Sequence, residues 1–153
     1  MSESVFLSYE KQGKVRKVDA GFVQVEKMLS EAIVDLHDAK KIVNIVDRPA
    51  YIAAYNAMLK AGRALLLMHG YIPDDGAQHK TVVEICGKLL GKKYADLAQE
   101  FETMRRKRND MTYEGNILLE RSEVPKALDH AIKLLKKVLE EAKKRNPQLS
   151  LDI

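Results

Sequence analysis

Apolar residues recur at alternating spacings of three and four along most of this chain, and this period limits its possible folds more than any other feature. Residues at that spacing lie on one face of an α-helix. Strand-type alternation of apolar and polar residues runs over no comparable length. The sequence therefore predicts a chain built from amphipathic helices. In the first helical segment the apolar positions are Phe22, Val25, Leu29, Ala32, Leu36, Ala39 and Val43.

Residues suited to helix ends divide this pattern into five expected helices. Aspartate and serine cap helix starts, proline is tolerated in a first turn, and glycine favours helix ends. Four long helices and one short helix with short connections predict an all-α fold, an up-and-down four-helix bundle with one additional short helix. The boundary residues, in chain order, are Asp19, Asp47, Pro49, Gly70, Gly91, Gly115, Ser122 and Asn146-Pro147.

The length of 153 residues fits one domain with a sizeable core. We expect residues 18–146 to form this domain, residues 1–17 to be a flexible basic segment, and residues 147–153 to be a tail. No apolar run is long enough to span a bilayer, and the single Cys86 fits a reducing compartment, so we expect a cytoplasmic protein without membrane contact. The net charge of +4 permits a polyanionic partner without requiring one.

One residue departs from the helical pattern of the fourth segment. Its apolar positions Tyr94, Leu97, Phe101 and Met104 lead, at the same spacing, to Arg108. A buried guanidinium needs a carboxylate, a group of carbonyls or an anionic ligand, because an unpaired buried charge is costly. A second interpretation places Arg108 at a helix end, where its stem reaches water and the helix dipole favours a cation.

The residues after Arg108 favour a functional interpretation. Asn109 follows directly, and Tyr113 comes after four intervening residues. This resembles the motif of the HEPN (higher eukaryote and prokaryote nucleotide-binding) family, in which an arginine, often followed by Asn or Asp, precedes a histidine at four to six intervening residues. The alanine-rich segment 53–66 and the following loop, with His79 beyond it, are also similar to that family. The resemblance covers roughly residues 19–145.

Membership of the HEPN family would imply metal-independent RNA cleavage, with no cofactor. Arg108 would stabilise the charge that develops on the phosphate, since a guanidinium matches phosphate oxygens in a fork. Tyr113 would take the position of the proton-handling histidine. The family also implies a homodimer with the motif at the subunit cleft, and a role as a toxin–antitoxin or defence effector whose partner is a small nucleotidyltransferase. The expected ligand-binding residues are Arg105, Asn109, Asp110 and His79.

Two features of the motif weaken the prediction of catalysis. An unperturbed tyrosine has a pKa of about 10, against about 6.5 for histidine, so a phenol is a poor base near neutral pH. Residues five apart on a regular α-helix differ by roughly 140° around its axis. Arg108 and Tyr113 would therefore share one pocket only if the helix distorts or ends between them, or if a second subunit completes the site.

Three functions remain open from the sequence. The first is an RNA-cleaving or RNA-binding HEPN-like effector, favoured by Arg108 and its basic neighbours. The second is a catalytically inactive HEPN-like bundle that binds a nucleotide or a protein partner, favoured by Tyr113. The third is a plain structural helical protein, which would leave Arg108 without a purpose. No metal site is expected, because no two histidines have metal-ligand spacing.

Overall fold

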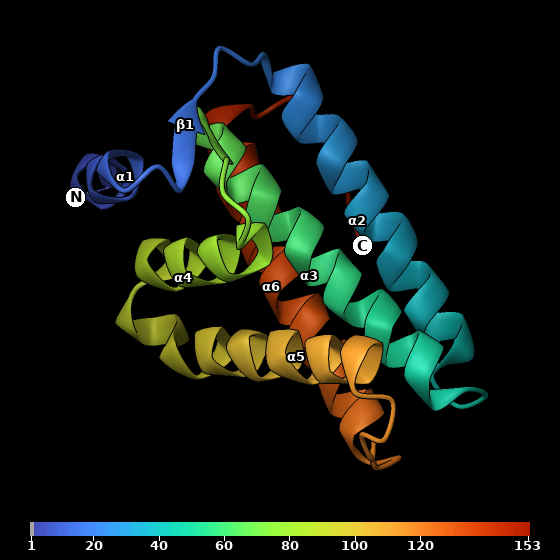
Figure 1. Ribbon diagram of the computed structural model, residues 1–153. Coiled ribbons are helices and arrows are strands. Elements are labelled where there is room, and N and C mark those ends of the chain that lie inside the picture. Colours follow the sequence, from blue (N-terminus) through green and yellow to red (C-terminus); the bar gives the residue numbers. More distant parts are fainter. Residues whose placement is uncertain (1) are drawn as a thin grey trace.

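The computed structural model describes residues 2–153 and shows a mostly helical chain (Figure 1). This confirms the predicted all-α class. The one exception is a small antiparallel pair of strands, β1 (Val15–Lys17) and β2 (Tyr71–Pro73). The helices are α1 (Ser2–Lys11), α2 (Phe22–Ile42), α3 (Asp47–Met68), α4 (Gln78–Leu90), α5 (Ala95–Tyr113) and α6 (Glu123–Arg145), with a 3-10 turn at Lys92–Tyr94.

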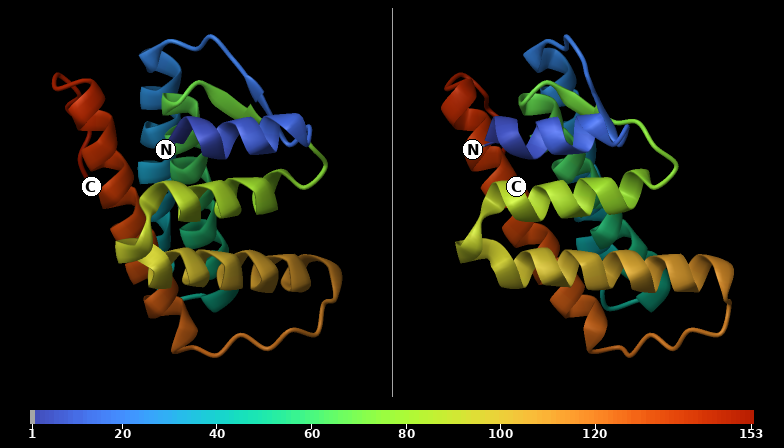
Figure 2. Two further views of the ribbon diagram at one scale, coloured as in Figure 1. Left: turned by 90° about the vertical axis from the view of Figure 1, so that its left-hand side faces the viewer. Right: turned by 60° about the vertical axis from the view of Figure 1, so that its left-hand side comes forward.

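The helices form two layers that run in different directions. The long helices α2, α3 and α6 pack against one another, and α3 contacts both of its partners along much of its length. Helices α1, α4 and α5 lie side by side and run across α3 (Figures 1 and 2). The expectation of helices running alongside one another therefore fits α2, α3 and α6, whereas α5 crosses them. This crossing brings the motif-bearing end of α5 close to the start of α4.

Most of the expected helix boundaries agree with the structure. Helix α3 begins at Asp47, and Gly70 and Gly91 adopt positive φ angles of 85° and 80° directly after α3 and α4. Glycine carries no Cβ, so it adopts this left-handed conformation without strain. The prediction of Asp19 as a cap is wrong, because α2 begins at Phe22 after an extended Gly21. Ser122 does precede α6, although its side chain forms no capping hydrogen bond.

The N-terminal segment is more ordered than its polar composition indicates. Residues 2–11 are helical, and residues 15–17 pair with β2. Phe6, Tyr9 and Val15 are buried, with Phe6 stacked on the ring of Tyr71 at 4.3 Å between centroids. The residues described from the expected flexible segment 1–17 are thus helical or paired in a strand, and three of their side chains are buried. Three apolar side chains at irregular spacing anchor it, and no periodic pattern reveals them.

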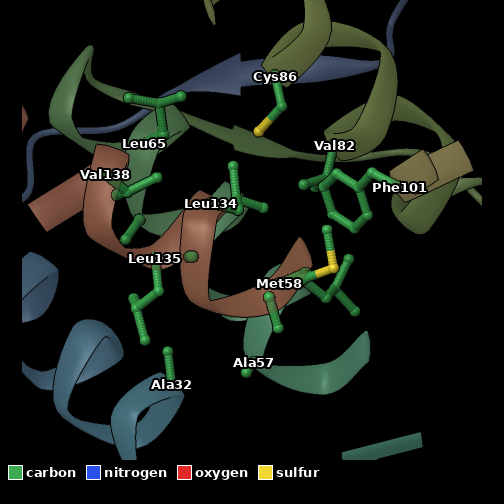
Figure 3. Packing of buried hydrophobic residues seen from close by; sticks show 14 of the residues in the cluster. Ala32, Ala57, Met58, Leu65, Val82, Cys86, Phe101, Leu134, Leu135 and Val138 are labelled. Carbon is green, nitrogen blue, oxygen red and sulfur yellow. The ribbon is translucent and has the colours of Figure 1, made fainter. Parts of the chain in front are cut away.

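The hydrophobic core lies around α3, which is buried on most of its surface. Side chains from α2, α4, α5 and α6 meet there, as Figure 3 shows for Ala32, Val82, Phe101 and Leu135. The small residues of α3 allow close approach. A Cβ added at Gly62 would meet Val82 Cγ1 at 2.7 Å and Cys86 Sγ at 2.9 Å. The α3–α4 spacing therefore depends on glycine at this position.

Within residues 2–153, no helix combines the length and the apolar character that crossing a membrane would require. The expected tail is also partly ordered against the core. Leu149 is buried in the core, and Leu151 and Ile153 are partly buried against the core.

Candidate functional site

A pocket of ≈ 450 Å³ opens where the start of α4 meets the C-terminal third of α3 and the C-terminal half of α5. We call it the arginine pocket, because three of its lining side chains are guanidinium groups. It contains five of the six residues expected from the sequence to form a site, all except Asp110. The lining residues are Arg63, Asp75, Gly76, Ala77, Gln78, His79, Lys80, Arg105, Arg108, Asn109 and Tyr113.

The cations that precede Arg108 on α5 already have carboxylate partners. Arg105 donates two hydrogen bonds to Glu102, from Nε at 2.6 Å and from Nη2 at 3.0 Å. Arg106 Nε donates to the same carboxylate at 2.9 Å, and Lys107 Nζ donates to Glu123 at 2.6 Å. These bonds hold the pKa of Glu102 below its usual value, with the Arg105 hydrogen bond as the largest cause. The basic run is therefore mostly compensated within the chain.

Arg108 and Arg63 differ from that run. The Nε of each is buried and has no hydrogen-bond partner among residues 2–153. Neither guanidinium forms an ion pair with a carboxylate of the described chain, and the single bond of Arg63 is a long one of 3.5 Å to Gln78 Oε1. A buried donor without a partner costs free energy, and more so for a charged group. These two side chains therefore face the pocket with unused hydrogen-bonding capacity.

His79 lines the pocket and is paired with a buried tyrosine, Tyr55, that does not line it. His79 lies in the first turn of α4, and its Nδ1 is 3.1 Å from Oη of the buried Tyr55 on α3. The position of Tyr55 follows from its place on the apolar face of α3, where its ring also packs 6.0 Å from that of Phe101. The pair therefore connects the pocket directly to the core.

Three guanidinium groups, those of Arg63, Arg105 and Arg108, act electrostatically on both His79 and Tyr55. Burial lowers the pKa of His79, and the positive charges of Arg63, Arg108 and Arg105 lower it further. Burial raises the pKa of Tyr55 to about 12, although the same three arginines oppose that shift. Both groups are therefore neutral near neutral pH, in a strongly positive environment. Such an environment favours an anionic ligand.

The motif residues occupy different positions relative to the pocket. Arg108, Arg105 and Asn109 line it, and Tyr113 reaches its edge although its side chain is 77% exposed. Helix α5 continues without a break through Tyr113, so the expected 140° separation is accommodated by placing the phenol at the rim. Asp110 does not line the pocket. The structure therefore separates it from the other expected binding residues.

The sequence did not identify Arg63 and Tyr55 as site residues. Arg63 interrupts an alanine-rich helix directly after Gly62 and three residues after Lys60, and a charge at this position was a usable signal. Tyr55 carries no such signal, because it resembles an ordinary core aromatic residue at an apolar position. Its contact with His79 depends on the packing of α4 on α3.

Other groups in the pocket support its walls. Thr81 Oγ1 donates to Asp75 Oδ2 at 3.0 Å, which ties the loop before α4 to the first turn of that helix. Within the described residues 2–153, no group of three or more His, Cys, Asp or Glu side chains is arranged to hold a metal ion. The functional groups that line the pocket are guanidinium, ammonium, imidazole, amide, phenol and carboxylate groups.

No protein-family model matches this chain, and the comparison with curated proteins finds no match. The function must therefore be argued from the pocket itself.

Proposed function

We propose that this protein is a HEPN-like RNA-binding effector that cleaves RNA without a metal ion, with a backbone phosphate held in the arginine pocket. The observation that carries the proposal is the pair of unpartnered guanidinium groups, Arg63 and Arg108, which converge on one pocket from different helices. Guanidinium groups bind phosphate oxygens in a fork and keep their charge at any physiological pH. A phosphate in the pocket would accept hydrogen bonds from the guanidinium groups of Arg63 and Arg108, which line it.

The size and lining of the pocket fit one nucleotide unit. Its ≈ 450 Å³ falls within the range of roughly 300–1,000 Å³ that small-ligand sites occupy. Asn109 and Gln78 add neutral donors and acceptors beside the charged groups, and these can bind ribose or base atoms. The phosphate that undergoes cleavage would gain negative charge, and Arg108 would stabilise that charge. Among the ways in which enzymes accelerate reactions, such charge stabilisation often contributes most.

The resemblance to the HEPN family suggests how this site is assembled. We propose that α2, α3, α5 and α6 correspond to the four helices of the family's bundle and α4 to the additional short helix. We also propose a homodimer in which the arginine pockets of two subunits share a cleft. The exposed Tyr113 and Leu118 lie beyond Arg108 and are available for such contacts. A small nucleotidyltransferase encoded as an antitoxin is the partner that this family assignment suggests.

Binding of a fluorescent single-stranded RNA tests the proposal. Arg108→Ala is expected to weaken binding by about tenfold or more, because charge-assisted hydrogen bonds contribute about 1.5–3 kcal/mol. Arg106→Ala is the matched control, since Arg106 lies two residues away, carries the same charge and does not line the pocket. Equal losses in both variants would show that binding depends only on net charge. Cleavage is measured in EDTA, which excludes a metal-dependent contaminant.

A second function is favoured by Tyr113. If the phenol at the pocket rim marks a site that no longer cleaves, the pocket binds a nucleotide and releases it unchanged. Tight, Arg108-dependent binding of a mononucleotide without any cleavage of single-stranded RNA would support this function instead of the first.

A further inference from the structure

We propose that His79 is the proton-transfer group of this site and that Tyr55 positions its ring. This inference rests on the proposed function, because it names the residue that would perform the acid–base step of RNA cleavage. The HEPN-like motif offers only Tyr113 for that step. The structure instead supplies an imidazole from a different helix, in the same pocket as Arg108.

The geometry of the pair gives His79 a defined orientation. Nδ1 is 3.1 Å from Tyr55 Oη, which leaves Nε2 as the ring nitrogen without a protein partner among residues 2–153. When Nδ1–H donates to the phenol oxygen, Nε2 carries the lone pair that can accept a proton from a ligand. Tyr55 is buried, and its ring is fixed by core packing, so it can hold the imidazole in one orientation.

The reaction can be written with one histidine. Nε2 of neutral His79 takes the proton of the ribose 2′-hydroxyl, and the 2′-oxygen forms a bond to the adjacent phosphorus. The bond from phosphorus to the 5′-oxygen of the next nucleotide breaks, and His79 returns its proton to that oxygen. The products are a 2′,3′-cyclic phosphate and a 5′-hydroxyl, and His79 ends in its starting state. Arg108 and Arg63 would neutralise the charge that develops on the phosphate oxygens.

The groups around His79 favour its neutral form before the reaction. Arg63 and Tyr55 face it from α3, and Arg105 and Arg108 face it from α5. Lys80 and Asp75 also line the pocket, and the Asp75 carboxylate accepts a hydrogen bond from Thr81. Burial and the arginine charges hold the pKa of His79 below its ordinary value, so the base form is populated at neutral pH. The exposed Tyr113 has no comparable set of contacts.

The first experiment compares RNA binding and RNA cleavage by His79→Gln, with the exposed His37→Gln on α2 as the matched control. We expect His79→Gln to lose about a hundredfold or more of the cleavage rate, and to lose less RNA binding than Arg108→Ala, since the arginines remain. His37→Gln should resemble the parent in both. Cleavage by His79→Gln at the parent rate would overturn the inference and leave Tyr113 as the motif's proton donor.

A second variant covers the case in which His79→Gln fails to fold. His79→Ala removes the ring and leaves a space in which free imidazole can bind. Added imidazole is expected to restore part of the lost cleavage in His79→Ala and to leave Arg108→Ala inactive. Absence of rescue in a folded His79→Ala protein that still binds RNA would count against proton transfer by this residue.

The role of Tyr55 is tested by the pH dependence of kcat/KM. The rate of the parent should fall on the acid side with an inflection below 6.5, the ordinary pKa of histidine, because protonated His79 cannot act as the base. Tyr55→Phe removes the acceptor of Nδ1–H, which disfavours the imidazolium. We expect a lower rate and an inflection moved to lower pH. An unchanged profile, or an inflection moved to higher pH, would overturn the positioning role.

These outcomes separate the inference from the proposed function. If RNA binding is independent of Arg108, the proposed function fails whatever His79 does. If binding and cleavage depend on Arg108 but cleavage does not depend on His79, only the inference fails.

Discussion

Two basic pockets lie at opposite ends of α4, and they differ in whether their cations already have partners. The arginine pocket lies at the N-terminal end of α4. The second, which we call the C-terminal pocket, measures ≈ 520 Å³ and lies at the other end. Each contains a half-buried histidine with a lowered pKa. The C-terminal pocket is lined by Ser4, Val5, Leu65, His69, Lys88, Leu89, Leu90, Gly91, Lys137, Glu141 and Arg145.

The cations of the C-terminal pocket are compensated within the chain. Lys137 Nζ lies 3.0 Å from Glu141 Oε1, and Arg145 contacts the Met68 carbonyl at 3.3 Å. Lys88 lies over the ring of Tyr9, 4.7 Å from its centroid. By contrast, the Nε of Arg63 and the Nε of Arg108 are buried without a hydrogen-bond partner among residues 2–153. The two pockets therefore both contain several cations but differ in whether buried guanidinium donors are left without a partner.

The largest expected effect comes from removing two cations from each pocket in turn. Arg63→Ala/Arg108→Ala should weaken RNA binding by about a hundredfold or more, at about 1.5–3 kcal/mol for each lost charge-assisted contact. Lys137→Ala/Arg145→Ala loses the same net charge and should change binding by less than about threefold. Fluorescence anisotropy at several salt concentrations measures both. Similar losses in the two double variants would remove the distinction between the pockets.

The sequence predicted the helices whose apolar residues repeat at helical spacing over a long stretch. The seam of α2 from Val25 to Ala39 is buried as expected, and Asp47, Gly70 and Gly91 mark helix boundaries in the structure. The N-terminal segment could not be predicted in this way. Phe6 and Tyr9 are anchored by contacts with distant residues, such as Tyr71 and Glu84, and local pattern carries no information about them.

The sequence predicted the site residues that are neighbours along the chain better than those brought together by folding. Arg108, Arg105 and Asn109 could be grouped because they are neighbours on one helix, and His79 was a weaker candidate. The convergence of Arg63 with Arg108 depends on how α3, α4 and α5 cross, which no spacing in the sequence encodes. Asp110 was grouped with its neighbours for the same reason and does not line the pocket.

The next effect tests the close α3–α4 contact that forms the arginine pocket. Gly62→Ala would place a Cβ 2.7 Å from Val82 Cγ1 and 2.9 Å from Cys86 Sγ. Overpacking of this kind costs about 1–3 kcal/mol, which exceeds the gain of about 1 kcal/mol from replacing a helical glycine by alanine. We expect a lower free energy of unfolding in urea and weaker RNA binding, because Arg63 is the next residue.

Gly21→Ala is the control for this substitution. Gly21 adopts an extended φ of −73°, and an added Cβ would only touch Gln24 at an ordinary 3.4 Å. Its effect on stability should be small. A Gly62→Ala protein as stable as the parent would mean that α4 can shift without cost.

A smaller effect tests whether a carboxylate partner prevents a cation from binding RNA. Glu102→Gln removes the carboxylate that holds Arg105, so Arg105 should become available and RNA binding should tighten by about two- to fivefold. Stability should fall by up to about 1 kcal/mol near neutral pH. The folded pKa of Glu102 is lowered, so its contribution is present above its ordinary value of 4.5 and disappears as pH falls through the folded pKa.

Urea denaturation as a function of pH measures this difference, and the exposed Glu31→Gln on α2 controls for the change in net charge. If both variants tighten RNA binding equally, the gain reflects overall charge and not the release of Arg105.

The smallest effect is a shift in one histidine titration. The pKa values of His79 and His69 are both lowered chiefly by burial, and neighbouring arginines lower them further: Arg63, Arg108 and Arg105 for His79, and Arg145 for His69. An anion bound in the arginine pocket would offset the positive charges around His79 and favour its imidazolium. Inorganic phosphate should therefore raise the pKa of His79 by up to about one unit, a shift equivalent to about 1.4 kcal/mol. The pKa of His69 should stay constant, because the cations of the C-terminal pocket already have partners.

Proton NMR of the imidazole Cε1–H resonances follows the titrations of His79 and His69 in one sample. His37 and His130 serve as internal references, and Arg108→Ala is the control that should abolish the response of His79. An equal rise in the pKa values of His79 and His69 would mean that the two pockets bind phosphate equally. Whether a cation has a partner would then not determine anion binding.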